Sequence, residues 1–305
     1  MAGRRRPRGR AVDGILLLDK PAGLSSNAAL QHVKRIYRAE RAGHTGNLDP
    51  LATGLLVVCL GEATKISGWL LDANKRYLAT CRLGARSTTG DAEGELIEPR
   101  PVPPLDAEQV DAVLARFTGR IEQVPPMYSA LKQDGKPLYE LARKGIEVER
   151  KVREVTIHSL RQTHLGGDEI GLDVHCSKGT YIRTLVEDIG EVIGCGGWLA
   201  ALRRTEVGPF SLDNAVTAEQ LQEVAGEGTD ALDRLLLPIE TAVADWPALE
   251  LSENLCFYLR RGQPVQVAGA PTSGLLRLQG PGGKFLGIGE MLDDGRIAPR
   301  RLFHG

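Results

Sequence analysis

The chain lacks the marks of membrane-spanning, disulfide-bonded and metal-binding proteins. Its longest apolar run, Leu55 to Leu60, is six residues long, whereas a membrane-spanning helix needs roughly 18 to 20. The five cysteines form no CxxC pair and stand near no histidine array of zinc-site spacing, so neither structural disulfides nor a metal site is expected. The basic start, MAGRRRPRGR, precedes no apolar stretch of signal-peptide length. We therefore expect a cytoplasmic protein with no membrane segment and no metal.

Sequence motifs for nucleotide-driven and hydrolytic enzymes are also absent. The chain has no GxxxxGK[ST], GxSxG, HExxH or EF-hand loop. Its nearest glycine pair, Gly287 and Gly289, lies among late strands with no helix behind it. These absences remove support for hydrolases with catalytic triads, for zinc proteases and for nucleotide-driven enzymes.

The charge is nearly balanced overall but unevenly distributed. The 305 residues carry a net charge of −1, with 42% hydrophobic and 25% charged residues, as in a globular protein of one large or two ordinary domains. Residues 211–254 hold ten acidic residues against one basic residue, Arg234, whereas residues 125–153 and 255–305 each hold seven basic residues. Separate basic surfaces are typical of a protein that binds a phosphate backbone, although an ordinary solvated surface would give the same pattern.

Apolar periodicity and capping residues predict an α+β protein. Asp106 with Gln109 is a capping-box variant, and Ser25 or Ser26 can cap an earlier helix. We expect strands at 14–20, 55–61, 75–83, 152–162 and 169–176, and helices at 26–38, 62–71, 106–118, 180–193 and 252–261.

Composition divides the chain into three parts. Residues 1–10 form a basic tail that we expect to be disordered, and residues 11–247 form the main domain. Within it, residues 125–151 are irregular and too long for an ordinary connector, which indicates a functional insertion. Residues 248–305 contain short apolar strands split by glycines, which predicts a small β-barrel.

The stretch HTGNLDPLATGLL, His44 to Leu56, is the strongest candidate for a site. Asp49 lies between Leu48 and Pro50 in a glycine-framed loop, which suits a lone reactive carboxylate. From the residues alone, a simple turn start at Asp49-Pro50 is favoured over a catalytic role. Packing or exposure alone would likewise explain the other candidates: His44, Tyr77, Tyr181, Arg183 and Leu202.

This stretch resembles the active-site motif of the TruB family of tRNA pseudouridine synthases, and the resemblance extends in family order from about residue 14 to 302. Asn47 is a departure, because many members have a small apolar residue there. The matching segments are LLLDKPAGLSSN at 16–27, GEATK and KRYLAT within 61–80, PPMYSALK at 125–132, HCSKGTYIRTL at 175–185, LRRTEVG at 202–208 and GKFLGIGEMLDDGRIAPRRL at 283–302.

The resemblance implies a pseudouridine synthase fold, with a mixed central β-sheet flanked by helices, and isomerisation of uridine 55 in the tRNA T-loop. This isomerisation needs no redox change, group donor or energy source, so the resemblance implies that no cofactor is used, in agreement with the missing cofactor motifs. Asp49 matches the catalytic aspartate, which must be ionised whether it attacks ribose C1′ or removes a C2′ proton. Arg183 matches the arginine that pairs with it, and Tyr77 the tyrosine that stacks on the target base. The other matches are His44, which fills the space left by the extruded uridine, Tyr181 and Leu202, which line the pocket, and Lys20, which supports it.

The family also implies two RNA-binding regions outside the pocket. The insertion would grip RNA through Lys132, Lys136, Arg143 and Lys144. The final barrel would be PUA-like and contact RNA through Arg260, Arg261, Arg300 and Arg301.

We expect a monomer whose partner is the T-arm of tRNA. A non-catalytic RNA chaperone or translation-associated RNA-binding protein on the same scaffold is the alternative. A glycosidase is less favoured, because such enzymes usually need two cooperating carboxylates and only one is placed for the work.

Overall fold

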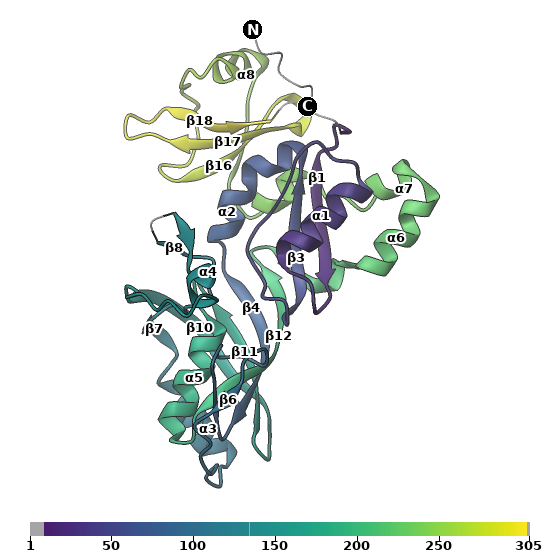
Figure 1. Ribbon diagram of the computed structural model, residues 1–305. Helices are drawn as coiled ribbons and strands as arrows, with labels where there is room; N and C mark the ends of the chain where they lie inside the picture. Colours follow the sequence, from purple (N-terminus) through teal and green to yellow (C-terminus); the bar gives the residue numbers. More distant parts are fainter. Residues whose placement is uncertain (1–8, 134, 304–305) are drawn as a thin grey trace.

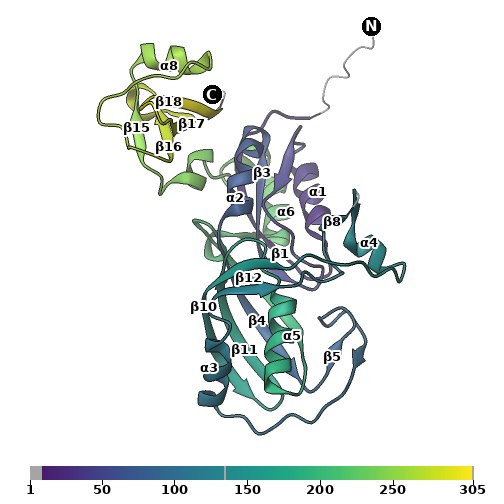
Figure 2. The same cartoon turned by 90° about the vertical axis from the view of Figure 1, so that its left-hand side faces the viewer.

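A computed structural model describes residues 9–133 and 135–303 of the chain. One long, mixed sheet runs through the larger part of the molecule, and a second, four-stranded sheet lies at one end (Figure 1). Viewed from the side, the smaller sheet with helix α8 lies beyond one end of the larger sheet (Figure 2). No helix in the described ranges is both long and apolar enough to cross a membrane.

The main sheet has the strand order β14-β1-β3-β12-β4-β11-β10-β7, with β13 paired to β12 and β2 to β3. Strand β12 pairs parallel with β3 and antiparallel with β4, so the sheet is mixed, as predicted. Its strands are β1 (Gly14–Lys20), β2 (Ala42–His44), β3 (Thr53–Leu60), β4 (Lys75–Leu83), β7 (Gly119–Gln123), β10 (Arg153–Gly166), β11 (Glu169–Cys176), β12 (Gly197–Val207), β13 (Phe210–Ser211) and β14 (Val216–Thr217).

Helices pack on this sheet and enclose its apolar cores. Ser25 caps α1, and Asp106 and Gln109 form the predicted capping box of α3. Apolar side chains of α3 and α5 share one core with β4, β10 and β11, and those of α1 and α6 share another with β1 and β3. The helices are α1 (Ser26–Ile36), α2 (Ser67–Asp72), α3 (Ala107–Ala115), α4 (Leu138–Ala142), α5 (Ile182–Ile193), α6 (Ala218–Glu227), α7 (Thr229–Asp233) and α8 (Glu253–Arg260), with short 3₁₀ helices η1 (Gly61–Ile66), η2 (Leu212–Asn214), η3 (Ile239–Val243) and η4 (Pro281–Gly283).

The predicted strands are confirmed, but β12, at the centre of the sheet, was not predicted. Its residues lack a clean alternation because the register shifts between Leu199 and Ala201 and again between Arg204 and Glu206. The helix expected at 62–71 is instead the 3₁₀ helix η1 followed by α2. The insertion consists of a two-stranded hairpin, β8 (Lys132–Gln133) and β9 (Lys136–Pro137), followed by α4; another small hairpin pairs β5 (Arg86–Ser87) with β6 (Leu96–Ile97).

The C-terminal strands form one four-stranded sheet in the order β15-β16-β17-β18. Its two edge strands, β15 and β18, are not paired with each other in the described residues, so closure into the predicted barrel is not confirmed. Ile288 and Phe303 of this part pack into the same apolar cluster as Ile66 and Leu70. The strands are β15 (Ala248–Glu250), β16 (Leu275–Gln279), β17 (Phe285–Met291) and β18 (Ile297–Leu302).

Residues 1–8 of the basic tail expected at 1–10 lie outside the described residues. Arg10 is held in place, because its guanidinium donates two hydrogen bonds, of 2.6 and 2.7 Å, to the Asp233 carboxylate. The expected domain boundaries at residues 10 and 247 stay predictions.

Candidate active site

The loop between β2 and β3 carries Asp49, and hydrogen bonds fix the backbone on both sides of it. Ser26 Oγ accepts from Leu48 N at 2.7 Å and donates to Leu48 O at 3.1 Å. Pro50 O accepts from Gly23 N at 2.8 Å. The Asp49 carboxylate therefore projects from a held segment, and 38% of its side-chain surface stays exposed.

Arg204 of β12 binds backbone carbonyls of the same loop and of the start of β3. Its guanidinium donates to Leu55 O at 2.7 Å and to Asn47 O and Gly46 O at 3.3 Å each. The residue is only 1% exposed. Gly54, with φ +99°, is required next to it, because a Cβ there would lie 2.3 Å from Arg204 O. Sequence reasoning missed Arg204, because the strand that carries it, β12, was not predicted.

Arg183 lies in the first turn of α5 and points at Asp49, with 3.1 Å between Nη2 and Asp49 Oδ2. Its guanidinium also donates to Thr89 O at 3.0 Å and to Tyr128 O at 2.6 Å. Its side chain is only 5% exposed, so it is not an exposed helix arginine. The expected pairing of Asp49 with Arg183 is present in the structure.

A second carboxylate, Asp91, completes this cluster and was not predicted. Its Oδ2 lies 3.5 Å from Arg183 Nε, and its side chain is 3% exposed. Thr89 Oγ1 and Glu93 N both donate to Asp91 Oδ1, at 2.5 and 3.1 Å. Arg183 is thus placed between a buried carboxylate and the partly exposed one of Asp49.

The environment of Asp49 acts on its pKa in opposing directions. Burial is the largest effect and raises the pKa above the usual aspartate value, and the charge of Asp91 adds to this rise. The cation of Arg183, and more weakly that of Lys20, lowers it. The pKa of Asp49 is therefore raised overall. The Arg183 cation, which we expect to keep Asp49 ionised, opposes this rise but does not cancel it.

Tyr77 and Leu202 lie on neighbouring strands of the sheet and pack in one apolar cluster with Leu48 of the loop. Tyr77 of β4 pairs in register with Arg204 of β12. Burial raises the pKa of the Tyr77 hydroxyl, and the Arg204 cation opposes this rise. The hydroxyl therefore stays protonated at neutral pH.

His44, Lys20 and Tyr181 lie at the ends of elements around this loop. His44 ends β2, and burial and the Arg204 cation lower its imidazole pKa, which favours the neutral ring. Lys20 ends β1 fully buried, and burial lowers its pKa to about 8. Its Nζ donates to Pro21 O and Leu24 O, at 2.9 and 2.7 Å. Tyr181 precedes α5, and burial raises its hydroxyl pKa.

The predicted phosphate contacts of the insertion are exposed on β8, β9 and the end of α4. None of them forms an ion pair within the described ranges; Arg143 lies over the Tyr139 ring at 5.5 Å. These residues are Lys132, Lys136, Arg143 and Lys144. Their contact with RNA stays a prediction.

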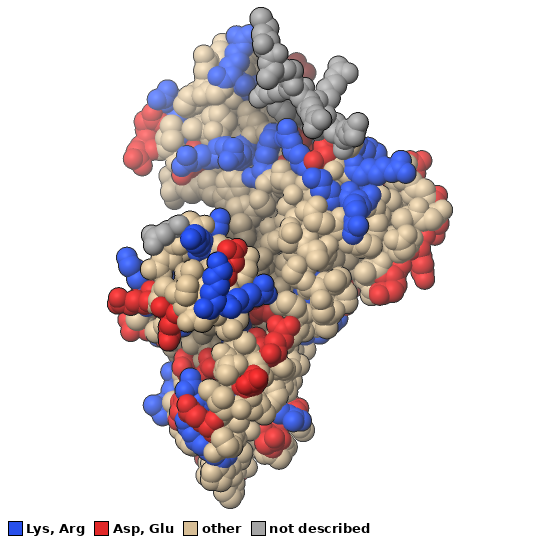
Figure 3. Space-filling model, in the orientation of Figure 1, with Lys and Arg blue, Asp and Glu red and all other residues tan. Residues whose placement is uncertain are grey.

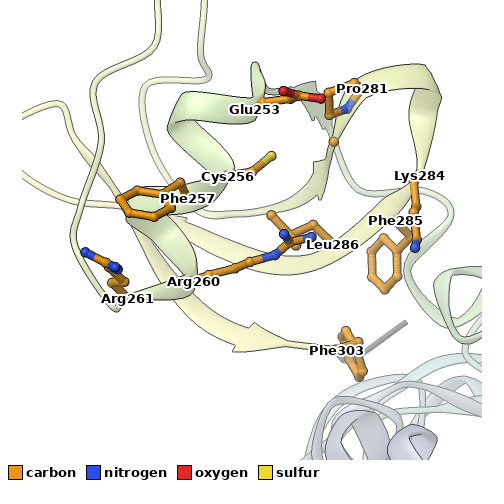
Figure 4. A pocket seen from close by; sticks show the side chains of 11 residues that line it. Glu253, Cys256, Phe257, Arg260, Arg261, Pro281, Lys284, Phe285, Leu286 and Phe303 are labelled. Atoms are coloured by element: carbon orange, nitrogen blue, oxygen red, sulfur yellow. The ribbon is translucent and has the colours of Figure 1, made fainter.

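The predicted C-terminal contacts divide between α8 and β18. Arg260 and Arg261 line a groove of about 450 Å³ together with Lys284, Phe285 and Phe303 (Figure 4). Arg300 and Arg301 are exposed on β18, and Arg300 forms an ion pair with Glu290. The groove combines basic side chains, which can contact phosphates, with aromatic side chains, which can contact bases. Its contact with RNA stays a prediction.

Within residues 9–133 and 135–303, no group of three or more His, Cys, Asp or Glu side chains is arranged to hold a metal ion. All five cysteines are buried and free.

Three family models match consecutive parts of the chain. Residues 34–182 match the N-terminal domain of the TruB family pseudouridylate synthases, and residues 183–244 the C-terminal domain of tRNA pseudouridylate synthase B. Residues 247–303 match the C-terminal part described as pseudouridine synthase II TruB.

Curated relatives match the chain over nearly its whole length. The tRNA pseudouridine synthase B of Nitrosococcus oceani is 56% identical, with 99% of this chain and 98% of the relative covered. The enzyme of the same name from Ectopseudomonas mendocina is 57% identical, with 97% and 96% covered.

Solved structures agree on the fold. A Cbf5-Nop10-Gar1 complex matches with a TM-score of 0.74 at 23% identity, covering 95% of this chain and 85% of that one. An H/ACA ribonucleoprotein bound to a substrate RNA containing 2′-deoxyuridine matches with 0.75 at 21% identity, covering 100% and 92%. The matching family models and the identity to the curated relatives show that the chain belongs to the TruB family of pseudouridine synthases.

Proposed function

We propose that this protein is a tRNA pseudouridine synthase that isomerises uridine 55 in the T-loop. The observation that carries this proposal is the Asp49 carboxylate, partly exposed and 3.1 Å from the buried guanidinium of Arg183, in a chain of the TruB family. The reaction breaks the bond from uracil N1 to ribose C1′ and joins uracil C5 to C1′; the hydrogen at C5 leaves to solvent as a proton, and N1 takes up a proton from solvent. No group donor or redox change is required, in keeping with the predicted lack of a cofactor.

Each residue of the site has a role that its surroundings support. Asp49 acts on the ribose in its ionised form, and Arg183 orients it. Tyr77 stacks on the extruded uracil, and Tyr181 and Leu202 line the pocket. His44, with its pKa lowered, supplies a neutral ring for the space that the uridine leaves. Lys20 supports the loop from its buried position.

RNA is positioned by exposed cations outside this pocket. The basic side chains of the insertion contact phosphates of the T-arm. RNA near the C-terminal sheet is contacted by Arg260, Arg261, Arg300 and Arg301. The protein acts as a monomer in the cytoplasm, where its tRNA substrate is found.

The alternatives explain fewer of these observations. A non-catalytic RNA chaperone would need the surface cations but not a partly exposed aspartate held against a buried arginine. A glycosidase would need a second carboxylate facing the substrate, whereas Asp91 is buried behind Arg183.

An isolated T-arm stem-loop with tritium at uridine C5 should be a competent substrate. Joining C5 to C1′ must expel the C5 hydrogen, so tritium release measures the chemistry and binding alone releases none. The control is a stem-loop with cytidine at the target position and tritium at that cytidine's C5. If full-length tRNA reacts and the stem-loop does not, recognition is not confined to the T-arm. If neither reacts, the proposed function is wrong.

The reaction should lose rate at acid pH, at a higher pH than an ordinary aspartate would predict. The pKa of Asp49 is raised, so kcat/KM should fall as pH decreases through that raised value. Asp91→Asn removes a like charge and should move the acid limb to lower pH. Measurements of kcat/KM from about pH 4 to 8 on both proteins test this; an unchanged limb would mean that another group controls it.

A further inference from the structure

The end of helix α1 carries three basic side chains without acidic partners. Lys34 and Arg35 lie in the last turn of the helix, and Arg38 follows its C-cap. Arg35 and Arg38 are exposed. None of the three forms an ion pair in the described part of the chain, and neither does the nearby Glu40. We call Lys34, Arg35 and Arg38 the α1 patch.

Many other surface arginines are neutralised, which distinguishes the α1 patch. Arg76 pairs with Asp173, Arg100 with Glu191 and Arg203 with Asp19, at 2.6 to 2.8 Å. Lys and Arg side chains gather on the molecular surface where α1 ends (Figure 3). A helix C-terminus favours one or two cations through its dipole, but that effect does not require Arg38, which lies beyond the helix.

The backbone at Arg38 gives an independent reason to assign it a function. Arg38 N donates to Arg35 O and Ala39 N to Lys34 O, at 3.1 and 3.0 Å, which is a Schellman end with Arg38 at the position that usually holds glycine. Its φ is +49°, a left-handed conformation that disfavours a residue with a Cβ. An unpaired arginine held in a strained conformation, where glycine would fit without strain, points to a requirement for its side chain.

The position of α1 indicates which part of an RNA would reach the patch. Ser26, at the start of α1, holds Leu48 of the Asp49 loop, and the 11-residue helix places its other end about 16 Å away. In the view of Figure 1 the insertion lies to the left of β4 and α1 to its right. A T-arm gripped by the insertion and held in the site would therefore leave the far end of α1 to another part of the RNA.

We propose that the α1 patch binds the phosphate backbone of tRNA outside the T-arm. This inference rests on the proposed function, because the RNA is the substrate of the same protein. The patch adds affinity for folded tRNA and does not touch the reacting base.

Affinities of full-length tRNA and of the isolated T-arm stem-loop, measured across a salt series, test this proposal. Arg38→Gly should weaken binding of full-length tRNA about fivefold and lower its log–log salt slope by about 0.9, the effect of one lost phosphate contact. The stem-loop should bind as before, within about twofold. The melting temperature should be unchanged or higher, because glycine relieves the strain. Arg38→Lys should keep most of the affinity.

Arg116→Gln is the matched control, because Arg116 is exposed at the end of α3 and is also unpaired within the described ranges. Its variant should bind both RNAs normally. Equal loss with both RNAs would place the contact within the T-arm, and no loss with tRNA would mean that the patch does not bind it; either result overturns the proposal. Tritium release by the unmodified protein separately tests the proposed function.

Discussion

Asp49→Asn should abolish pseudouridine formation while tRNA affinity stays within a few-fold. The amide keeps the shape of the side chain but cannot act as an ionised carboxylate, and loss of a negative charge does not weaken phosphate contacts. Burial and Asp91 raise the pKa of Asp49, so its charged form costs stability at neutral pH and the neutral amide should leave the melting temperature unchanged or higher.

Tritium release under single-turnover conditions and equilibrium binding measure these two effects separately. The unmodified protein and an Asp19→Asn variant serve as controls, since Asp19 pairs with Arg203 and not with Arg183. Residual turnover by Asp49→Asn above about one tenth of the unmodified rate would show that another group performs the chemistry.

Arg183→Met should reduce the single-turnover rate by about 100-fold or more, because a displacement of ~1 Å at a reacting group can cost that much. Methionine removes the guanidinium that holds Asp49, Thr89 O and Tyr128 O in one arrangement. The acid limb of kcat/KM should also move to higher pH, because the cation that lowers the Asp49 pKa is gone.

This variant also leaves Asp91 buried without its cation, and breaking a buried ion pair can cost about 3 to 5 kcal/mol. The double variant Arg183→Met/Asp91→Asn removes the stranded charge and should recover stability without recovering rate. Circular dichroism melts and tritium release on both proteins distinguish these effects. Recovery of rate along with stability would mean that Arg183 serves folding alone.

The site residues that could be predicted from the sequence are mainly those that lie in recognisable local motifs. The stretch around Asp49 and the segment TYIRTL at 180–185 could be matched to a family, so the pairing of Asp49 with Arg183 was expected. From the residues alone, both were ambiguous, because the 3.1 Å contact joins positions far apart in the chain. Only the folded sheet brings them together.

Asp91 and Arg204 could not be predicted for the same reason. Asp91 lies in an ordinary-looking turn, and its partner Arg183 is on a distant helix. Arg204 binds three backbone carbonyls of the Asp49 loop, and no sequence pattern encodes such partners. The strands of the fold were predictable where apolar and polar residues alternate, as in β4, and not in β12, where two register shifts break the alternation.

The apolar cluster that Ile288 and Phe303 share with Ile66 and Leu70 makes the two sheets energetically dependent on each other. Unfolding of the C-terminal segment would expose part of the core beneath η1 and α2, so its loss would also destabilise the larger sheet. Amide protons on both sides of this cluster should therefore exchange with similar protection. The C-terminal part thus stabilises the larger sheet through this shared core.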